Sequence, residues 1–336
     1  MTVAGVEKRT RPRLGFLGVG WIGRHRMNAI VEADLADVAA IAEPSDDTAV
    51  EALKLAPEAE RVGGLDELLA MGLDGIVIAT PSALHAEQSM LALASGAAVF
   101  CQKPLGRNAA EVGAVVDAAR VADRLLAVDL SYRFTDGMRR IREVVRSGEL
   151  GRVHAVDLVF HNAYGPDKPW FYDPKLSGGG CVTDLGVHLV DLALWCLDFP
   201  EVADVSSTLF AAGERLGPDP AKVEDYAVAT IELASGPAIR LACSWRLQAG
   251  RDAIIEAAFY GTGGGAALRN VDGSFYNFTA ERYRGTGRET LASPPDEWGG
   301  RAAADWARRL AAGERFDAGA DELVQVARVL DRIYGR

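Results

Sequence analysis

The sequence predicts two domains of different architecture: an α/β domain with a doubly wound parallel sheet, then an α+β domain with a large, mainly antiparallel open sheet. Three observations carry this prediction. The 336 residues exceed the usual length of one domain. Short apolar runs alternate with segments of helical periodicity as far as about residue 131. Beyond that point, longer runs with partial alternation follow each other closely.

The first domain is expected over residues 11–131. After Arg13 the chain reads LGFLGVG and continues at once as WIGRHRMNAIVEA, the pattern of a strand, a glycine turn and a helix. Further strands are expected at 37–43, 74–80, 97–103 and 125–130. Because these short runs are apolar on both faces, they indicate a parallel sheet that helices cover on each side.

The second domain is expected over residues 132–319. Its strand-like runs are GRVHAVDLVFHN, VADVSSTLFAA, EDYAVATIEL, AIRLACSWRL and AIIEAAFYG, and TDLGVHLVDLALWCL is the single helix expected among them. A sheet whose far face lacks a helical cover needs another cover, which predicts a homo-oligomer, a homodimer or homotetramer.

The closing segment, residues 320–336, is amphipathic and is expected to pack back on the first domain. Its apolar stripe consists of Leu323, Val326, Ala327, Leu330 and Tyr334.

Composition indicates an ordinary globular protein, with 49% apolar and 25% charged residues. The net charge of −11 and the lack of a dense basic cluster argue against a nucleic-acid partner. No apolar run reaches the roughly 18 residues of a membrane span, and the N-terminus lacks the apolar core of a signal peptide. We therefore expect no membrane association and a cytoplasmic location.

The four cysteines form no CxxC pair, which favours reduced thiols: Cys101, Cys181, Cys196 and Cys243. Cys181, Asp184 and His188 share one helical face, so a zinc site is an alternative for that face. Cys181 equally suits a plain buried position, and we expect no metal.

A dinucleotide-binding turn is predicted by Gly18, Gly20 and Gly23, which form GVGWIG between a strand and a helix. The glycines allow a tight turn and a close approach to a pyrophosphate, and the helix supplies amides at its N-terminus. Glu43 ends the second strand about 20 residues later, where a carboxylate binds ribose hydroxyls. Its charge would repel a 2′-phosphate, which favours NAD over NADP.

Two further motifs follow predicted strands of the first sheet. Thr80 and Pro81 begin TPSALHAE, which contains His85, and Gln102 and Lys103 begin QKPLG. In a doubly wound sheet, ligands bind beyond the carboxyl ends of the strands. Taken alone, the first motif could be a capped helix start with an exposed histidine, and the lysine could be a strand-end residue with its charge in water.

The segment GGGCVTDLGVHLVD, residues 178–191, places Asp184, His188 and Asp191 on one helical stripe, because their spacings are four and three residues. Three polar groups on an otherwise apolar stripe need partners. The glycines ahead of them are interpreted as allowing the backbone to pass close to a bound nicotinamide.

In this order and spacing, the motifs resemble the Gfo/Idh/MocA family, named for glucose-fructose oxidoreductase and inositol dehydrogenase. The resemblance covers nearly the whole chain: GVGWIG with His25 beyond it, TPSALHAE, QKPLG, GGGCVTDLGVHLVD and the closing helix. It implies a Rossmann domain, an NAD(P) cofactor, a C-terminal sheet domain that mediates oligomerisation, and hydride transfer at a secondary alcohol or carbonyl of a sugar, sugar derivative or cyclic polyol such as inositol.

The resemblance also implies roles for individual residues. The lysine of the family's EKP motif matches Lys103, and its helix aspartate and histidine match Asp184 and His188, which are expected to be catalytic. The residues expected to bind the cofactor are Gly18, Gly20, Trp21, Ile22, Gly23, Glu43, Thr80, Pro81, His85, Gln102 and Lys103. Two positions depart from the family pattern: Gln102 replaces the usual glutamate, and Phe171 stands where many relatives carry arginine.

The expected reaction has His188 accept the hydroxyl proton, Lys103 donate a hydrogen bond to the developing alkoxide, and Asp184 orient the substrate or the imidazole. Asp191 is interpreted as a structural or orienting carboxylate. Two alternatives stay open: an NAD-dependent glycoside hydrolase or lyase acting by transient oxidation, and a non-catalytic NAD-dependent regulator. Candidate residues for a sugar pocket are Tyr132, Arg133, His161, Tyr164, Trp170 and Trp245, beside Asp184 and His188.

Overall fold

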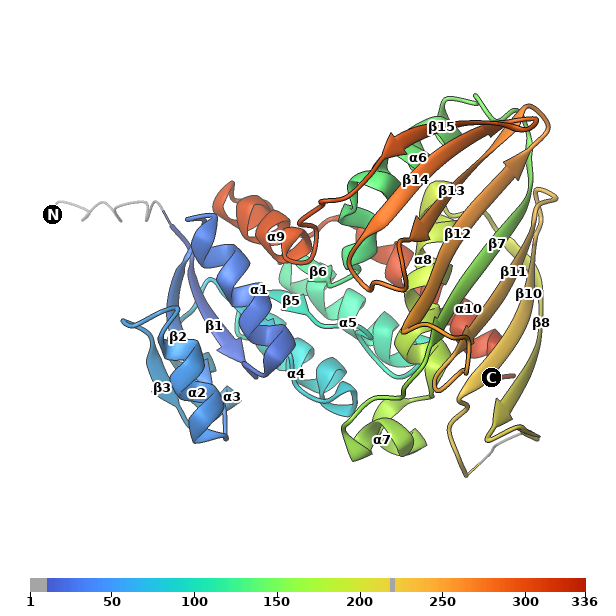
Figure 1. Ribbon diagram of the computed structural model, residues 1–336. Coiled ribbons are helices and arrows are strands. Elements are labelled where there is room, and N and C mark those ends of the chain that lie inside the picture. The colour runs from blue at the N-terminus through green and yellow to red at the C-terminus, as the bar shows by residue number, and fades with distance from the viewer. Residues whose placement is uncertain (1–10, 218–220) are drawn as a thin grey trace, which may run out of the picture.

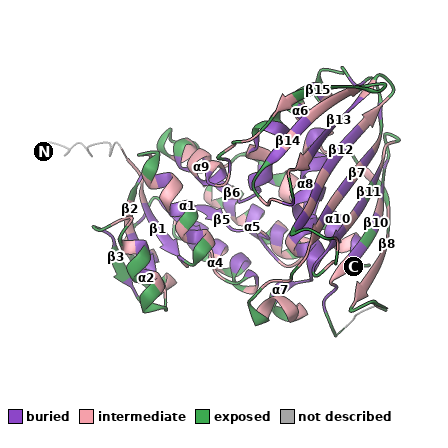
Figure 2. Cartoon of the chain, viewed as in Figure 1, coloured by how far each residue is buried: buried purple, intermediate pink, exposed green. Residues whose placement is uncertain are grey.

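The computed structural model describes residues 11–217 and 221–336 and contains two sheets that lie side by side, each with its own helices (Figure 1). Buried residues run along the strands of both sheets, and exposed ones gather on outer elements such as α2 (Figure 2). The expected fold class, an α/β domain followed by a large and mostly antiparallel sheet, is therefore confirmed.

The first sheet has six parallel strands in the order β3-β2-β1-β4-β5-β6. The order reverses at β1, so β1 and β4 flank the switch point where ligands bind in such sheets. Every residue of β4 and β5 is buried, as their continuous apolar sequences require. The strands are β1 Arg13–Leu17, β2 Asp37–Ala42, β3 Glu60–Val62, β4 Gly75–Ile78, β5 Ala98–Cys101 and β6 Leu126–Val128.

Five helices connect these strands: α1 Trp21–Glu32, α2 Asp46–Leu53, α3 Leu65–Ala70, α4 Ser82–Ala94 and α5 Ala109–Ala122. Side chains cap two of them, since Ser45 and Asn108 accept hydrogen bonds from amides in the first turns of α2 and α5. Helix α1 has no such cap, which leaves its first amides free toward the glycine turn.

The second sheet has nine strands in the order β15-β14-β13-β12-β7-β11-β10-β8-β9. All neighbours are antiparallel except β7 and β11. The strands are β7 Val153–Asn162, β8 Val202–Ala211, β9 Glu214–Arg215, β10 Tyr226–Leu233, β11 Ala238–Ser244, β12 Ala253–Gly261, β13 Gly264–Asn270, β14 Phe278–Arg284 and β15 Gly287–Ala292.

Helices cover one face of this second sheet. Helix α6 (Asp136–Arg146) packs on β13 to β15, α8 (Val187–Cys196) packs on β7, β11 and β12, and α10 (Asp321–Ile333) packs on β8. The shared core includes Phe160, Leu189 and Phe259, all buried. The opposite face carries no helix among the described residues (Figure 1).

Two helices of the C-terminal half differ from the expectation that a single helix interrupts its strands. Helix α6 lies between the two sheets in sequence, and α9 (Arg301–Ala311) returns to the first sheet, where it packs on α1 and β5. Helix α6 holds four arginines in eleven residues, so its apolar stripe of Met138, Ile141 and Val144 is narrow. Five strands are also additional to the expected ones: β3 in the first sheet, and β9, β13, β14 and β15 in the second.

Helix α10 lies between the two halves of the molecule. It contacts α5 of the first half and α8 and β8 of the second. Leu323 and Ala327 join the core beside α5, whereas Val326 and Leu330 join the core of the second sheet. The boundary expected at residues 131 and 132 falls in a short 3₁₀ turn, Ser131–Phe134, between β6 and α6.

One continuous helical stretch, Pro174–Cys196, is long and apolar enough to cross a membrane by length and composition, contrary to the expectation that no such run exists. It joins α7 (Pro174–Ser177), a π-helical turn at Val182–Gly186 and α8. Its apolar window is 89% buried inside the protein, as in a core helix. The apolar composition of this stretch therefore reflects packing inside the fold.

Trp306 anchors α9 to the first sheet and provides a test of that packing. Its ring is 1% exposed, lies 5.8 Å from the ring of Phe100, and occupies the space that a side chain at Gly75 would need. We expect Trp306→Ala to lower the free energy of unfolding by about 3–5 kcal/mol, because it leaves a large cavity. Urea unfolding measures this free energy. Trp21 is 62% exposed, and Trp21→Ala serves as the control. A loss no larger than that of the control would contradict the packing.

Candidate active site

A cavity of about 500 Å³ lies where the carboxyl ends of the first sheet's strands face the helices of the second sheet. Residues from both halves line it. Of the residues expected to bind cofactor or substrate, eleven line this cavity: Gly20, Trp21, Ile22, Thr80, Pro81, His85, Gln102, Lys103, Trp170, Asp184 and His188. The remaining ones do not line it: Gly18 and Gly23 belong to the glycine turn, Glu43 binds an amide of that turn, Tyr132 packs against His188, and Arg133 binds Asp191.

The three glycines of GVGWIG have separate structural reasons. Gly18 has φ +84°, and a Cβ there would meet the Ala79 carbonyl oxygen at 2.7 Å. A Cβ at Gly23 would meet the Gly18 carbonyl oxygen at 2.4 Å, so this glycine allows the helix to approach the strand. A Cβ at Gly20 would meet nothing within 4 Å, because Gly20 faces open space at the uncapped start of α1. This open cradle of free amides suits a dinucleotide pyrophosphate.

Glu43 stands directly after β2 and beside the glycine turn. Its carboxylate accepts hydrogen bonds from the amides of Val19 and Ser45, both at 3.0 Å. Arg61 donates to the Glu43 carbonyl oxygen at 2.9 Å and pairs with Asp46 at 2.7 Å. The carboxylate is thus held at the end of β2, the position that binds ribose hydroxyls in this fold.

His85 joins the two loops that follow β4 and β5. The ring is 1% exposed, and its nitrogens lie 2.7 Å from the carbonyl oxygens of Thr80 and Pro104. Burial lowers the pKa of this imidazole. His85 therefore holds the Thr80 and Lys103 loops at a fixed separation, a role that its position in TPSALHAE alone did not reveal.

Lys103 connects the two halves of the molecule at the cavity. It follows β5, and its Nζ donates to the Asp184 carboxylate at 2.6 Å and to the Asp184 carbonyl oxygen at 2.7 Å. Asp184 lies in the π-helical turn, where Val187 N–H bonds five residues back to the Val182 carbonyl. A π turn contains an extra residue, so its hydrogen-bond ladder leaves a carbonyl available to a side chain.

Trp245 completes the Asp184 site. Its indole N–H donates to the second carboxylate oxygen of Asp184 at 3.0 Å. The two Asp184 oxygens are thus bonded to Lys103 and Trp245, so Asp184 orients the Lys103 ammonium rather than the His188 imidazole that sequence analysis offered as an alternative.

The three glycines ahead of this turn are required by local packing and not by the cavity alone: Gly178 has φ +83° and lies against Arg107, whereas Gly179 and Gly180 pack against a tyrosine and a buried glutamate. A Cβ at Gly179 would lie 2.0 Å from the Tyr334 hydroxyl, and one at Gly180 would lie 1.9 Å from the Glu224 carbonyl oxygen. Glu224, 1% exposed, accepts hydrogen bonds from the amides of Gly180 and Val182 and from the Tyr334 hydroxyl at 2.8 Å. These bonds fix the start of the helical segment that carries Asp184 and His188.

His188 lines the cavity from the first turn of α8. Its ring lies 4.9 Å from the Tyr132 ring, and its Nδ1 is enclosed without a hydrogen-bond partner among the described residues. Burial, followed by the positive charges of Lys103 and Arg26, lowers the pKa of this imidazole well below 6.5. The ring is therefore neutral near pH 7 and can accept a proton.

Asp191 and Arg133 form a buried pair outside the cavity. Arg133 Nε and Nη2 donate to the two Asp191 oxygens at 2.8 and 2.6 Å, and Nη1 donates to Glu322 of α10 at 3.0 Å. Burial raises the pKa of Asp191 and opposes the effect of Arg133. This bidentate pair ties α8 to α10, so the third polar group of the helical stripe is structural, and the Arg133 guanidinium is directed to this pair instead of the cavity.

Several lining residues carry chemistry that the sequence analysis did not assign. Arg26, Asp129 and Ser131 line the cavity, and the first two form a buried ion pair of 2.6 Å. Asp129 directly follows β6, so its place at the carboxyl end of a strand was the available signal. Trp170 and Phe171 stack with ring centroids 3.8 Å apart and form an aromatic wall at the open side.

Two candidate residues lie outside the cavity, one on the second sheet and one in the loop after β7. His161 on β7 bonds to the Ser244 hydroxyl at 2.8 Å and stacks on Tyr226. Tyr164 is 51% exposed and lies against Phe275. Cys181, considered above for a zinc site, donates to the Cys243 carbonyl oxygen at 3.4 Å and does not line the cavity.

Comparison with known proteins decides the family. The model described as "Oxidoreductase family, NAD-binding Rossmann fold" matches residues 13–130, and "GFO/IDH/MocA C-terminal domain" matches residues 138–267. A putative UDP-kanosamine synthase oxidoreductase subunit of Amycolatopsis mediterranei is 31% identical over 274 residues, which are 76% of this chain and 75% of that protein. This chain belongs to the Gfo/Idh/MocA oxidoreductase family. It is thus an NAD(P)-binding oxidoreductase with a Rossmann domain.

Other relatives extend this finding. D-glucoside 3-dehydrogenase of Escherichia coli is 31% identical over 211 residues, and the match spans 60% of either protein. Levoglucosan dehydrogenase, solved in complex with NADH and levoglucosan, has the same fold with a TM-score of 0.82 at 21% identity, and 96% of each chain is covered.

The charge state of His188 follows from its surroundings and can be measured. We expect its pKa, followed by NMR, to lie below 6.5, so that the ring stays mostly neutral at pH 6.5. Lys103→Gln should raise that pKa because it removes a neighbouring positive charge. The exposed Lys175→Gln serves as control. A pKa of 6.5 or above in the unmodified protein would contradict the enclosure of this ring.

Proposed function

We propose that this member of the family is an NAD-dependent dehydrogenase that oxidises a secondary alcohol of a neutral sugar, sugar derivative or cyclic polyol, or reduces the corresponding carbonyl. One observation carries the proposal. The Lys103 ammonium from the first sheet and the His188 imidazole from the second domain line the same cavity as the open glycine cradle. Residues 11–131, with the closing segment 320–336 packed against them, would form the cofactor domain, and residues 132–319 would form the substrate domain.

The cradle at Gly20 would take the pyrophosphate, Glu43 the adenosine ribose, and the loops at Thr80 and Gln102 the nicotinamide half. When bound, NAD supplies the hydride acceptor. The roles of the protein residues follow from the geometry. Neutral His188 accepts the hydroxyl proton at Nε2, since Nδ1 is enclosed. Lys103 is held by a carboxylate oxygen and the carbonyl oxygen of Asp184. Its ammonium donates a further hydrogen bond to the substrate oxygen, which gains negative charge as the hydroxyl loses its proton.

The charges around the cavity favour an uncharged substrate. Each lysine and arginine that lines it has a carboxylate partner that lines it too: Arg26 with Asp129 at 2.6 Å, Lys103 with Asp184 at 2.6 Å, and Lys168 with Asp167 at 3.4 Å. Phe171 adds an apolar surface to the cavity, and with Trp170 it suits the apolar face of a sugar ring. A phosphate or carboxylate on the substrate would meet no unpaired cation among these lining residues.

The kinetic test screens cyclic polyols, aldoses, glycosides and sugar phosphates for NADH formation at 340 nm, with NAD and NADP compared. We expect a neutral compound to be oxidised with net NADH accumulation and NAD to be preferred, because Glu43 would repel a 2′-phosphate. His188→Ala or Lys103→Ala should lower kcat by roughly 10²-fold or more while the Kd for NADH changes little. Lys175→Ala is the matched control.

Three outcomes would contradict parts of this proposal. Wild-type turnover in either active-site variant would remove the assigned roles. Glycoside cleavage without net NADH would favour transient oxidation, in which NAD is regenerated in each cycle. Stable nucleotide binding without turnover of any compound would favour a regulator.

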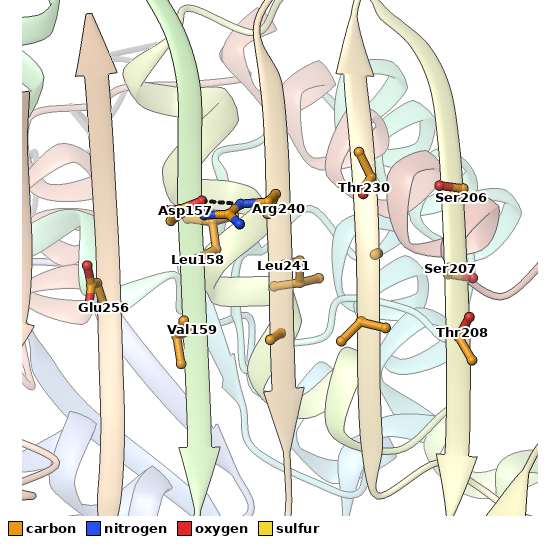
Figure 3. A pocket seen from close by; sticks show the side chains of 13 residues that line it. Asp157, Leu158, Val159, Ser206, Ser207, Thr208, Thr230, Arg240, Leu241 and Glu256 are labelled. Atoms are coloured by element: carbon orange, nitrogen blue, oxygen red, sulfur yellow. Dashed lines mark hydrogen bonds and ion pairs between the residues drawn. The ribbon is translucent and has the colours of Figure 1, made fainter.

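We also propose that a second copy of the chain covers the open face of the nine-stranded sheet. Figure 3 looks onto this face, with the helices behind the sheet, and shows side chains of β7, β8, β10, β11 and β12 around a shallow hollow. Small residues and Val228, 37% exposed, alternate there with polar side chains and the Asp157–Arg240 pair. A face of mixed apolar and paired polar groups suits a self-complementary contact.

We also propose a cytoplasmic location. The four cysteines are buried and form no disulfide, which agrees with a reducing compartment.

Analytical ultracentrifugation tests the oligomer. We expect a dimer or tetramer, and Val228→Glu should shift it toward monomer because a charge would enter a contact between copies. Val121→Glu, at an 87% exposed position on α5, is the matched control and should leave the assembly unchanged. A monomeric unmodified protein, or a Val228→Glu variant that assembles normally, would contradict this interface.

A further inference from the structure

Three polar side chains form a buried cluster at one side of the cavity, apart from Lys103, Asp184 and His188. Arg26 of α1, Gln102 after β5 and Asp129 after β6 all line the cavity and are 5%, 7% and 2% exposed. One Asp129 oxygen, Oδ2, accepts hydrogen bonds from Arg26 Nε at 2.6 Å and from Gln102 Nε2 at 2.7 Å.

The second oxygen of Asp129 has no such partner. Oδ1 is fully enclosed and is without a hydrogen-bond partner in the described parts of the chain. Leaving a buried carboxylate oxygen unpaired costs free energy, so such atoms mark places where a ligand or water completes the bonding. Asp129 is also a lining residue of the cavity, so this unpaired oxygen belongs to a side chain next to the space that a bound molecule would fill.

The cluster also explains why residue 102 is a glutamine in this chain. A glutamate there would place a carboxylate oxygen where Gln102 Nε2 now lies, 2.7 Å from Oδ2 of Asp129. Two carboxylates at that separation repel each other strongly when buried, and Arg26 supplies a single positive charge between them. Gln102 avoids this repulsion and donates a hydrogen bond instead.

We propose that Asp129 is a binding residue of this site: it carries the negative charge that the resemblance places at position 102, and its Oδ1 accepts a hydrogen bond from an N–H or O–H of the bound molecule. The donor is either the carboxamide of the nicotinamide or a hydroxyl of the substrate. The charge relocation, that is, the negative charge at Asp129 instead of at position 102, depends on the protein alone. Whether the cofactor or the substrate donates the hydrogen bond to Oδ1 rests on the proposed function.

The binding arm of the test uses Asp129→Asn, which preserves size and replaces the carboxylate by an amide. NADH is titrated by fluorescence, and KM is measured for the alcohol found in the kinetic screen. We expect either the Kd for NADH or the KM for the alcohol to rise roughly 10-fold or more, since hydrogen bonds to a charged group contribute strongly to binding. A weaker Kd for NADH assigns the donor to the cofactor, and a raised KM with unchanged NADH affinity assigns it to the substrate.

The stability arm measures Tm without ligands for Gln102→Glu, Asp129→Asn and the double variant. Asp129→Asn alone should lower Tm, because Arg26 loses its buried partner. In the Gln102→Glu background the same change should raise Tm, because it returns the cluster to one carboxylate beside one guanidinium. Asp117 is an exposed carboxylate on α5, and Asp117→Asn is the control. Its effect on Tm should have the same sign with Gln102 and with the Gln102→Glu change.

Two results would overturn the proposal. An Asp129→Asn variant with unchanged NADH affinity and unchanged KM would show that Oδ1 binds nothing. A Tm that falls by the same amount in both backgrounds would show that the charges at 102 and 129 do not compete. If no alcohol is oxidised, the proposed function fails, yet the NADH titration still decides whether Oδ1 binds the cofactor, and the Tm comparison still decides the charge relocation.

Discussion

The contact between Lys103 and Asp184 is the constraint on which the rest of the site depends. Lys103 belongs to the loop after β5 of the first sheet, and Asp184 belongs to a helical turn of the second half. Their hydrogen bonds of 2.6 and 2.7 Å set the relative position of the two layers at the cavity. Lys103 and His188 come from different layers, so a small relative shift would separate the two groups to which the proposed function assigns the chemistry.

The surroundings of this contact are built to hold it in one geometry. Trp245 occupies the second oxygen of Asp184, and the π-helical turn releases the carbonyl that Lys103 also uses. Behind them, the buried Glu224 carboxylate binds the amides that begin the turn. His188 receives no hydrogen bond at Nδ1 from the described residues, and burial beside positive charges keeps it neutral. The site thus holds the Lys103 ammonium in place by several hydrogen bonds. It leaves the His188 imidazole neutral, as the proposed proton transfer requires.

Sequence patterns predicted the architecture, because strand, glycine turn and helix alternate with clear periodicity through β1 to β6. Of the residues expected to bind cofactor or substrate, the fold brings eleven to one cavity, and their roles stay predictions. The patterns did not predict α9 in the first sheet's core, since its contacts with α1 and β5 join segments far apart in the sequence. The glycines of GGGC were linked to a ligand, whereas their packing partners, Glu224 and Tyr334, lie over 40 residues away. Asp129 was missed for the same reason: its role depends on Arg26 and Gln102, brought together by the fold.

The hydrogen bond between Tyr334 and Thr183 spans 151 positions of the chain and stands next to Asp184. During synthesis the strands β1 to β6 are complete once residue 128 has left the ribosome, but α9, whose Trp306 packs in the core of this sheet, follows only after residue 300. The cavity is completed later still, when residue 334 arrives and its ring fills the place beside the glycines. The nascent chain therefore holds every strand of the parallel sheet long before it holds the side chains that complete either the core of that sheet or the cavity.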